Sequence, residues 1–256
     1  QSGERFDDSF VDFIERVLTR IKEETNGELG VTLSLGEQTK ETFKRWFNAG
    51  SHRYLLRIET SNEPLYKSLH PEDHSFQERL QAIKDLREVG YQVGTGVMIG
   101  LPGQAVEDLA DDLIFFRDWD IDMIGMGPYI PHKDTPMYGD FKMTDEYKTG
   151  HLDLALKMIA IARIYLKDVN IASTTALQAL NEVGREMGLS VGANIIMPNV
   201  TETKYREFYQ LYEEKPCINE NSSMCRDCLQ RRIEKVGEVI GYAEWGDSPH
   251  FKNKTG

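Results

Sequence analysis

Cysteine is scarce in this chain of 256 residues, and all three cysteines, Cys217, Cys225 and Cys228, lie in the last forty positions. An odd number of cysteines crowded into one region argues against a disulfide framework. Thiols are kept reduced in the cytoplasm, which is where we expect this protein. No apolar run approaches the ~18 residues that a membrane-spanning helix needs, so no membrane partner is expected.

Basic residues are also in deficit, with 30 lysines and arginines against 42 acidic residues and a net charge of −12. Such a surface argues against unspecific binding to nucleic acid or to anionic membranes. It leaves room for a small anionic ligand that a few arginines hold.

Strand-like and helix-like segments alternate along the chain, which predicts a parallel sheet covered by helices. The expected strands are 31–35, 53–59, 92–100, 122–127, 170–173 and 192–197, and the expected helices are 6–25, 40–49, 75–89, 107–119, 145–165, 176–187 and 227–240. Strand faces rich in glycine or polar residues favour a barrel, and a complete (β/α)8 barrel needs about 250 residues. We therefore predict an α/β fold, a partial (β/α) TIM-type barrel over 1–200 that lacks its first βα units, with a mostly helical C-terminal extension over 201–256.

The segment from Tyr54 to Thr60, YLLRIET, is expected to be a buried strand with one charged face. Side chains alternate along a strand, so Arg53, Arg57 and Glu59 share a face. Buried charges need partners. Two interpretations stay open: a structural arginine–glutamate pair, or a site inside the barrel for a zwitterionic or phosphate-like ligand.

A second unusual strand spans 92–100 and leads into the turn Gly-Leu-Pro-Gly at 100–103. Gly94, Gly96 and Gly100 share one face with Met98, which indicates close approach of a ligand or of another backbone, or tight core packing. The turn lies at the carboxyl end of the strand, where parallel barrels place their sites, and it lacks the lysine of a P-loop.

Other polar residues gain significance only from their position. Gln1 to Glu4 reads QSGE, Thr174 and Thr175 follow a strand, and Tyr209 and Tyr212 precede Cys217. Without a ligand, QSGE would be an ordinary turn, the threonines would form the N-cap of the next helix, and the tyrosines would be packing residues. The six histidines show no spacing that argues for catalysis and are expected mainly at the surface.

The cysteines follow the spacing Cys-x7-Cys-x2-Cys. A Cys-x2-Cys pair can direct both thiolates at one metal ion or cluster. Zinc would need a histidine or carboxylate as fourth ligand, and an iron–sulfur cluster would need an exogenous one. Free thiols are the alternative.

Several segments taken together resemble the radical S-adenosylmethionine (SAM) enzymes of the FeFe-hydrogenase maturase HydE family. They are VTLSLGEQ, YLLRIETSNEPLYKSLHP, GTGVMIGLPGQAVEDLADDL, MIGMGPYIPHKDTP, ASTTALQAL and GANIIMPN, within a match from Gln1 to about Ile240. Biotin synthase and the methylornithine synthase PylB share the GLPGQ-like and TP-loop features more loosely.

The resemblance implies that SAM is the cofactor and that a 5'-deoxyadenosyl radical acts in assembly of the di-iron subcluster of the hydrogenase. The residues that it assigns to SAM are Gln1, Ser2, Gly3, Glu4, Arg57, Glu59, Arg79, Met98 and Ile99. A small organometallic or amino-acid-derived substrate would contact Arg53, Thr174, Thr175, Met197, Tyr209 and Tyr212. Cys217, Cys225 and Cys228 would match an accessory iron–sulfur site, and other hydrogenase maturation proteins would be partners.

One departure concerns the cluster that reduces SAM. The family's Cys-x3-Cys-x2-Cys motif, which holds a 4Fe–4S cluster, is absent from these 256 residues. We expect its ligands upstream of Gln1, and the chain to be an N-terminally truncated, inactive piece of an enzyme. The alternatives are PylB- or biotin-synthase-like chemistry, a non-catalytic SAM-binding remnant, and a zinc-stabilised interaction protein.

Overall fold

The structure, a computed structural model, describes residues 4–139, 142–198, 200–206 and 222–255. The chain divides into two compact units. The first unit comprises the described residues of 1–97, 110–125 and 243–256, and the second those of 98–109 and 126–242. None of the helices in the described part of the chain is both long and apolar enough to cross a bilayer.

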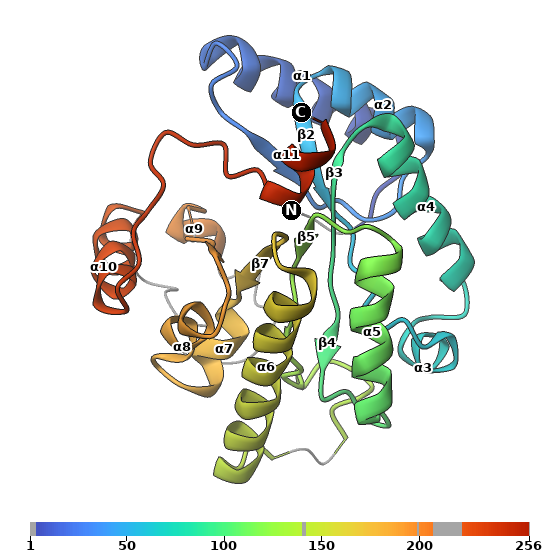
Figure 1. The fold of residues 1–256 in the computed structure, drawn as a ribbon. Helices are drawn as coiled ribbons and strands as arrows, with labels where there is room; N and C mark the ends of the chain where they lie inside the picture. Colours follow the sequence, from blue (N-terminus) through green and yellow to red (C-terminus); the bar gives the residue numbers. More distant parts are fainter. Residues whose placement is uncertain (1–3, 140–141, 199, 207–221, 256) are drawn as a thin grey trace. The chain divides into compact units, whose positions relative to one another are not determined.

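The first unit is built on a parallel sheet in the order β1-β2-β3-β5. Its strands are β1 Val31–Leu33, β2 Ser51–Leu55, β3 Gln92–Thr95 and β5 Met123–Ile124. Arg53 is opposite Gln92 and Gly94 is opposite Met123 in the parallel register. The helices are α1 Asp8–Glu24, α2 Lys40–Asn48, α3 Glu63–Leu69, α4 Phe76–Val89, α11 Pro249–Thr255 and the later part of α5 Val106–Asp118, and α2 packs against α4 (Figure 1).

The second unit contains two short parallel strand pairs with helices around them. The pairs are β4 Met98–Ile99 with β6 Gly127–Pro128, and β7 Asn170–Ser173 with β8 Ile195–Ile196. The helices of this unit are α6 Asp145–Leu166, α7 Thr175–Leu180, α8 Gly184–Ser190, α9 Thr203–Arg206 and α10 Ser222–Lys235.

Local sequence explains where several helices begin. The side chains of Asp7, Thr39, Asn62, Ser75 and Thr144 each accept a hydrogen bond from a main-chain N–H in the first turn of α1, α2, α3, α4 and α6. Such N-caps satisfy donors that the helix cannot pair internally, and replacing one by alanine typically costs about 1 kcal/mol.

The core of the first unit is aromatic. Phe43 and Tyr54 meet edge to face with ring centroids 5.0 Å apart, and the Tyr91 hydroxyl donates to the Phe43 carbonyl oxygen at 3.0 Å. Trp46 is fully buried, and its indole N–H donates to the Val11 carbonyl oxygen at 3.1 Å. The buried hydroxyl of Tyr91 and the buried indole N–H of Trp46 therefore both keep a partner, as burial of a polar group requires.

Helix α1 buries Val11 and Leu18, whereas the apolar side chains of Phe13 and Val17 are 52% and 37% exposed. The bond from Trp46 to the Val11 carbonyl oxygen fixes which side of the helix faces α2. Apolar spacing alone could not distinguish the two overlapping stripes.

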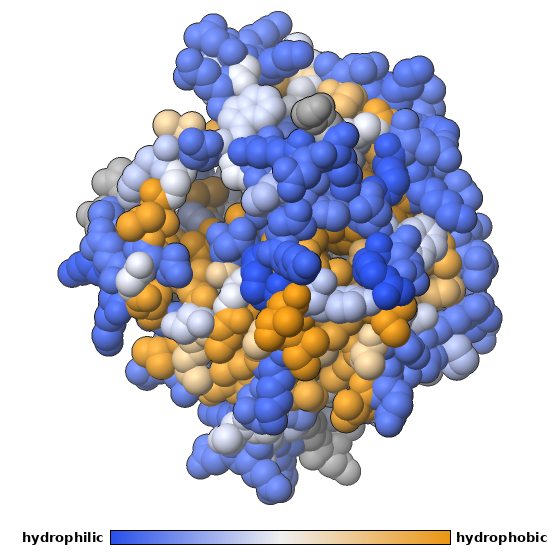
Figure 2. All heavy atoms as spheres, viewed as in Figure 1, coloured by the Kyte–Doolittle hydropathy of each residue, from blue (hydrophilic) through white to orange (hydrophobic). Residues whose placement is uncertain are grey.

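Figure 2 shows hydrophilic residues over the outer faces of α1, α2 and α4, whereas apolar residues gather over α6. The exposed apolar side chains of α6 are Ile161, Ile164 and Tyr165. Exposed apolar residues are common on soluble surfaces, and only a contiguous patch carries meaning.

Candidate functional site

The charged segment after β2 forms the centre of the candidate site in the first unit. The regular strand ends at Leu55, so the predicted strand to Glu59 is too long. The chain nevertheless stays alongside β3, because the amides of Leu56 and Glu59 donate to the Gly94 and Gly96 carbonyl oxygens at 2.9 and 3.0 Å. Tyr54, Leu56 and Ile58 are buried, and the side chains between them are half-exposed, as the alternation predicted.

Arg57 and Glu59 lie together on the half-exposed side. The Arg57 Nη2 atom is 3.0 Å from Glu59 Oε2 and donates to the Val97 carbonyl oxygen at 2.9 Å. The Nε atom of Arg57 is buried and has no hydrogen-bond partner among the described residues. The pair thus retains one buried donor and partly exposed charges, at 33% and 20% exposure, that a ligand can still reach.

Glu59 also has an unusual main chain. Its φ is 63°, in the left-handed region that residues other than glycine rarely occupy, and it forms an isolated parallel bridge with Val97. Such a conformation costs on the order of 1–3 kcal/mol and persists where the surroundings enforce it. Strain of this kind clusters at binding and catalytic sites, which favours a functional interpretation of the pair.

Arg79 supports the pair from α4. Its Nη1 donates to the main-chain oxygen of Arg57 at 2.9 Å, its Nε donates to Glu37 Oε1, and its Nη2 lies 3.6 Å from Glu4 Oε1. The side chain is only 10% exposed. Arg79 therefore fixes the backbone beneath Arg57 and is already hydrogen-bonded to protein groups.

Glu4, the last residue of QSGE, lies against Gly36 in the loop after β1. A Cβ atom on Gly36 would come within 1.8 Å of Glu4 Cγ, and Gly36 has a φ of 76°. Glu4 Oε1 also accepts from the Glu37 amide at 2.9 Å. Only glycine suits this position, because both the backbone angle and the close contact exclude a side chain.

The glycine face of β3 and β4 is filled by protein. A Cβ on Gly96 would come within 2.0 Å of the Gly125 carbonyl oxygen, one on Gly94 within 2.7 Å of Met123 Cε, and one on Gly100 within 2.4 Å of the His151 ring. Of the interpretations left open by the sequence, close backbone approach and tight packing are correct.

Met98 and Ile99 form β4 at the start of the second unit, directly after Val97 in the chain. The Met98 carbonyl oxygen accepts from Gln104 Nε2 at 3.0 Å, and Gln104 Oε1 accepts from the Gly100 and Leu101 amides. The side chain of Gln104 thus forms hydrogen bonds with main-chain groups before and within the Gly-Leu-Pro-Gly turn and stabilises its conformation.

Thr174 and Thr175 also lie in the second unit, at the start of α7. Thr174 has the N-cap position but makes no capping bond with its side chain. Its Oγ1 is buried, and no residue in the described part of the chain forms a hydrogen bond with it. The simple N-cap interpretation therefore does not account for this hydroxyl. Met197 follows β8 and is 55% exposed.

Arg53 lies apart from Arg57 and Glu59, within β2, and points toward the C-terminal segment. Its guanidinium donates to Thr32 Oγ1 at 2.9 Å, to the Trp245 carbonyl oxygen and to Asp247 Oδ1 at 3.2 Å. Gln92 Nε2 donates to the same carboxylate oxygen at 2.9 Å. These contacts give Arg53 a structural role in the first unit.

Several predicted ligands lie outside the described residues, namely Gln1, Ser2, Gly3, Tyr209, Tyr212 and Cys217. Cys225 belongs to α10, three positions before Cys228, and Cys228 is a half-buried free thiol. Among the residues that the structure describes, no group of three histidine, cysteine or carboxylate side chains could hold a metal ion. The accessory cluster therefore stays a prediction.

Sequence reasoning missed the partners that complete the site. Glu37 anchors Arg79, and His74 lies 3.3 Å from Glu4 Oε2 through its Nε2 atom. All six histidines are half-buried, which corrects the expectation that most lie at the surface. The only local signal for these partners in the sequence was the position of His74, which directly follows Asp73 and lies four positions after His70.

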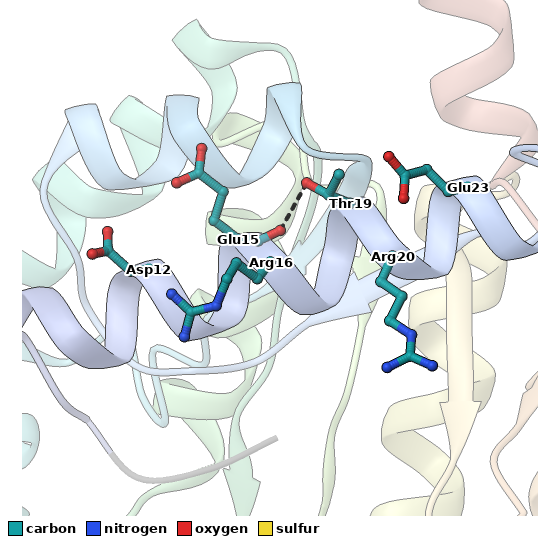
Figure 3. A pocket seen from close by; sticks show the side chains of 6 residues that line it. All are labelled: Asp12, Glu15, Arg16, Thr19, Arg20 and Glu23. Atoms are coloured by element: carbon teal, nitrogen blue, oxygen red, sulfur yellow. Dashed lines mark hydrogen bonds between the residues drawn. The ribbon is translucent and has the colours of Figure 1, made fainter.

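A hollow of about 500 Å³ lies elsewhere, along the outer face of α1 (Figure 3). It is lined by Asp12, Glu15, Arg16, Thr19, Arg20 and Glu23, and Thr19 Oγ1 donates to the Glu15 carbonyl oxygen at 3.0 Å. Arg45 pairs with both Asp12 and Glu15. A hollow lined by one helix face with mixed charges is a solvated surface rather than a ligand site.

Comparison with known proteins shows which family the chain is similar to. Residues 2–116 match the Radical SAM superfamily. Over 88% of its length the chain is 46% identical to the [FeFe] hydrogenase maturase subunit HydE of Thermotoga maritima. Over residues 2–116 the chain is similar to the radical SAM superfamily. It is also 30% identical, over 75% of its length, to a biotin synthase of Picosynechococcus.

Solved structures confirm the fold class, a partial (β/α) barrel. Methylornithine synthase (PylB) aligns with a TM-score of 0.71 over 91% of this chain, at 21% identity. The hydrogenase maturase HydG aligns with a TM-score of 0.70 over 92% of the chain, at 19% identity. The chain spans 62% of the length of the Thermotoga maritima relative, 48% of that biotin synthase, and 64% and 52% of the two aligned structures.

Proposed function

We propose that this chain is the SAM- and substrate-binding part of a radical SAM enzyme of the HydE type, which acts in assembly of the di-iron subcluster of FeFe-hydrogenase. The observation that carries the proposal is the Arg57–Glu59 pair, with its buried unpartnered Nε and its strained backbone. The 46% identity to a HydE maturase supports the same assignment.

The charges of the pair suit SAM, which carries a carboxylate, an amine and a sulfonium. We assign Arg57 to the carboxylate, because a guanidinium binds that group with directional, charge-assisted hydrogen bonds. We assign Glu59 to the ammonium or the ribose hydroxyls. Arg79 keeps the Arg57 backbone in place, and the Met98 and Ile99 main chain is assigned to the adenine.

The residues of this chain do not fit the 4Fe–4S cluster in the way that they fit SAM. In the family it supplies the electron that cleaves SAM, but the three cysteines of this chain do not form the Cys-x3-Cys-x2-Cys motif that holds it. We therefore derive no step through the cluster. The residues described here bind and orient SAM and exclude water from it.

The substrate side of the proposal rests on the second unit. The buried Thr174 hydroxyl has no partner among the residues that the structure describes, so a polar group of the substrate would satisfy it. We assign Thr175, Met197, Tyr209 and Tyr212 to the same small organometallic or amino-acid-derived substrate. Other hydrogenase maturation proteins are the proposed partners.

Isothermal titration of the 256-residue protein with SAM tests the proposal. Replacing Arg57 by glutamine removes a charge-assisted contact, which corresponds to roughly a 10- to 100-fold loss of affinity. The matched control is Arg20→Gln, because Arg20 is 76% exposed on α1 and pairs only with Glu24 in the described structure. Absence of SAM binding, or equal affinity in R57Q and the unmodified protein, would refute the assignment.

A further inference from the structure

The short connection between α3 and α4 contacts the segment that precedes α1. His74, in this connection, directs its Nε2 atom at Glu4 Oε2, 3.3 Å away. Its Nδ1 atom lies 3.1 Å from Asp73 Oδ1. The imidazole therefore lies between two carboxylates, one local and one seventy positions earlier in the chain, and all three residues belong to the first unit.

The contact matters because the other carboxylate oxygen of Glu4 is held by a separate set of protein groups. Glu4 Oε1 accepts from the Glu37 amide and lies 3.6 Å from Arg79 Nη2, and the side chain fills the space over Gly36. Arg79 in turn binds the Arg57 main chain. One connected set of contacts thus runs from His74 through Glu4 and Arg79 to the Arg57–Glu59 pair.

Charged and titratable groups face His74 from each neighbouring element. Asp73 comes from its own connection, Glu4 from the segment before α1, and His70 from the end of α3, with ring centroids 6.2 Å apart. Glu37 and Arg79 lie behind Glu4. The hydrogen bond with Asp73 is the largest influence and raises the pKa of His74; burial opposes it, and the charge of Glu4 raises the pKa further.

We propose that His74 is a pH-sensitive clamp that, when protonated, holds the Glu4 side chain in place and so positions this carboxylate for SAM. This inference rests on the proposed function for its ligand. The imidazolium bridges two carboxylates, whereas the neutral ring can donate to only one of them. The clamp is therefore complete below the ordinary histidine pKa and is lost as pH rises through the raised value in the folded protein.

The protein without SAM allows a first test. The His74 signal is identified in an NMR titration of the histidine ring protons by its loss in His74→Gln. We expect its midpoint above about 6.5, and Glu4→Gln should lower that midpoint by a few tenths of a pH unit, as for a partly exposed pair. A midpoint that does not respond to E4Q would refute the clamp.

SAM affinity measured between pH 6 and pH 8.5 provides the second test. At pH 6 we expect H74Q to bind SAM about two- to fivefold more weakly than the unmodified protein, the equivalent of an exposed ion pair. At pH 8.5 the two affinities should converge. The amino group of SAM itself titrates in this range, but it affects both proteins equally, so the ratio reports on His74.

His250→Gln is the matched control, because His250 pairs with a carboxylate, Asp120, at 2.7 Å in the first unit but belongs to α11. Its affinity ratio to the unmodified protein should be independent of pH. A constant ratio for H74Q would overturn the positioning role. If neither protein binds SAM, the proposed function and the positioning role both fail, and the NMR titration still decides whether the clamp exists.

Discussion

Asp247 is predicted to carry a large share of the stability of the first unit. Its Oδ1 atom accepts from Gln92 at 2.9 Å and lies 3.2 Å from both Arg53 and His52, and its side chain is 18% exposed. Asp247→Ala leaves the fully buried Gln92 amide without this acceptor and removes the only carboxylate paired with Arg53 in the described structure. Losing one charge-assisted bond and orphaning a buried donor should lower the free energy of unfolding by about 3 kcal/mol.

Urea unfolding followed by tryptophan fluorescence measures this loss, because Trp46, Trp119 and Trp245 all belong to the first unit. The urea concentration at the midpoint of unfolding should fall. The slope of the unfolding free energy against urea concentration should stay unchanged. The control is Glu24→Ala in α1 of the same unit, which removes an exposed pair with Arg20 and should cost less than about 0.5 kcal/mol. A change below about 1 kcal/mol in D247A would show that the Asp247 contacts are energetically unimportant.

Three other variants test packing by thermal unfolding. Gly150→Ala, within α6 where an added Cβ meets nothing within 4 Å, should stabilise by about 0.5–1 kcal/mol, and a loss would contradict the open geometry. Gly96→Ala should destabilise by at least about 2 kcal/mol, since its Cβ would overlap a carbonyl oxygen; a neutral result would refute the close packing. Thr174→Val should change stability by less than about 1 kcal/mol, because the hydroxyl has no partner to lose. A larger loss would mean that Thr174 is bonded in solution.

The elements with clear periodicity were predictable from sequence. Helix α6 and strand β7 lie within a residue of their expected bounds, because a long apolar stripe and a short run before two threonines leave few alternatives. The expected helix over 176–187 is two helices, α7 and α8, since the chain breaks at Asn181. Helices α3 and α11 were missed because each is only seven residues long.

The sequence predicted which charged residues form the site, but not the hydrogen bonds and ion pairs that hold them. The alternation around Arg57 and Glu59 follows from strand geometry, but the positive φ of Glu59 does not follow from any local propensity. The partners Glu37 and Asp247 are separated from Arg79 and Arg53 by 42 and 194 positions. Such pairings depend on the tertiary fold, which a single sequence does not specify contact by contact.

The return of residues 243–256 to the first unit sets an order for biosynthesis. The preceding piece of that unit ends at residue 125, so the ribosome adds more than a hundred residues before the segment that binds Gln92 and Arg53 exists. At ordinary translation rates this interval is on the order of ten seconds. During that time the side chains of Arg53 and Gln92 lack the carboxylate of Asp247 that pairs with them in the folded unit.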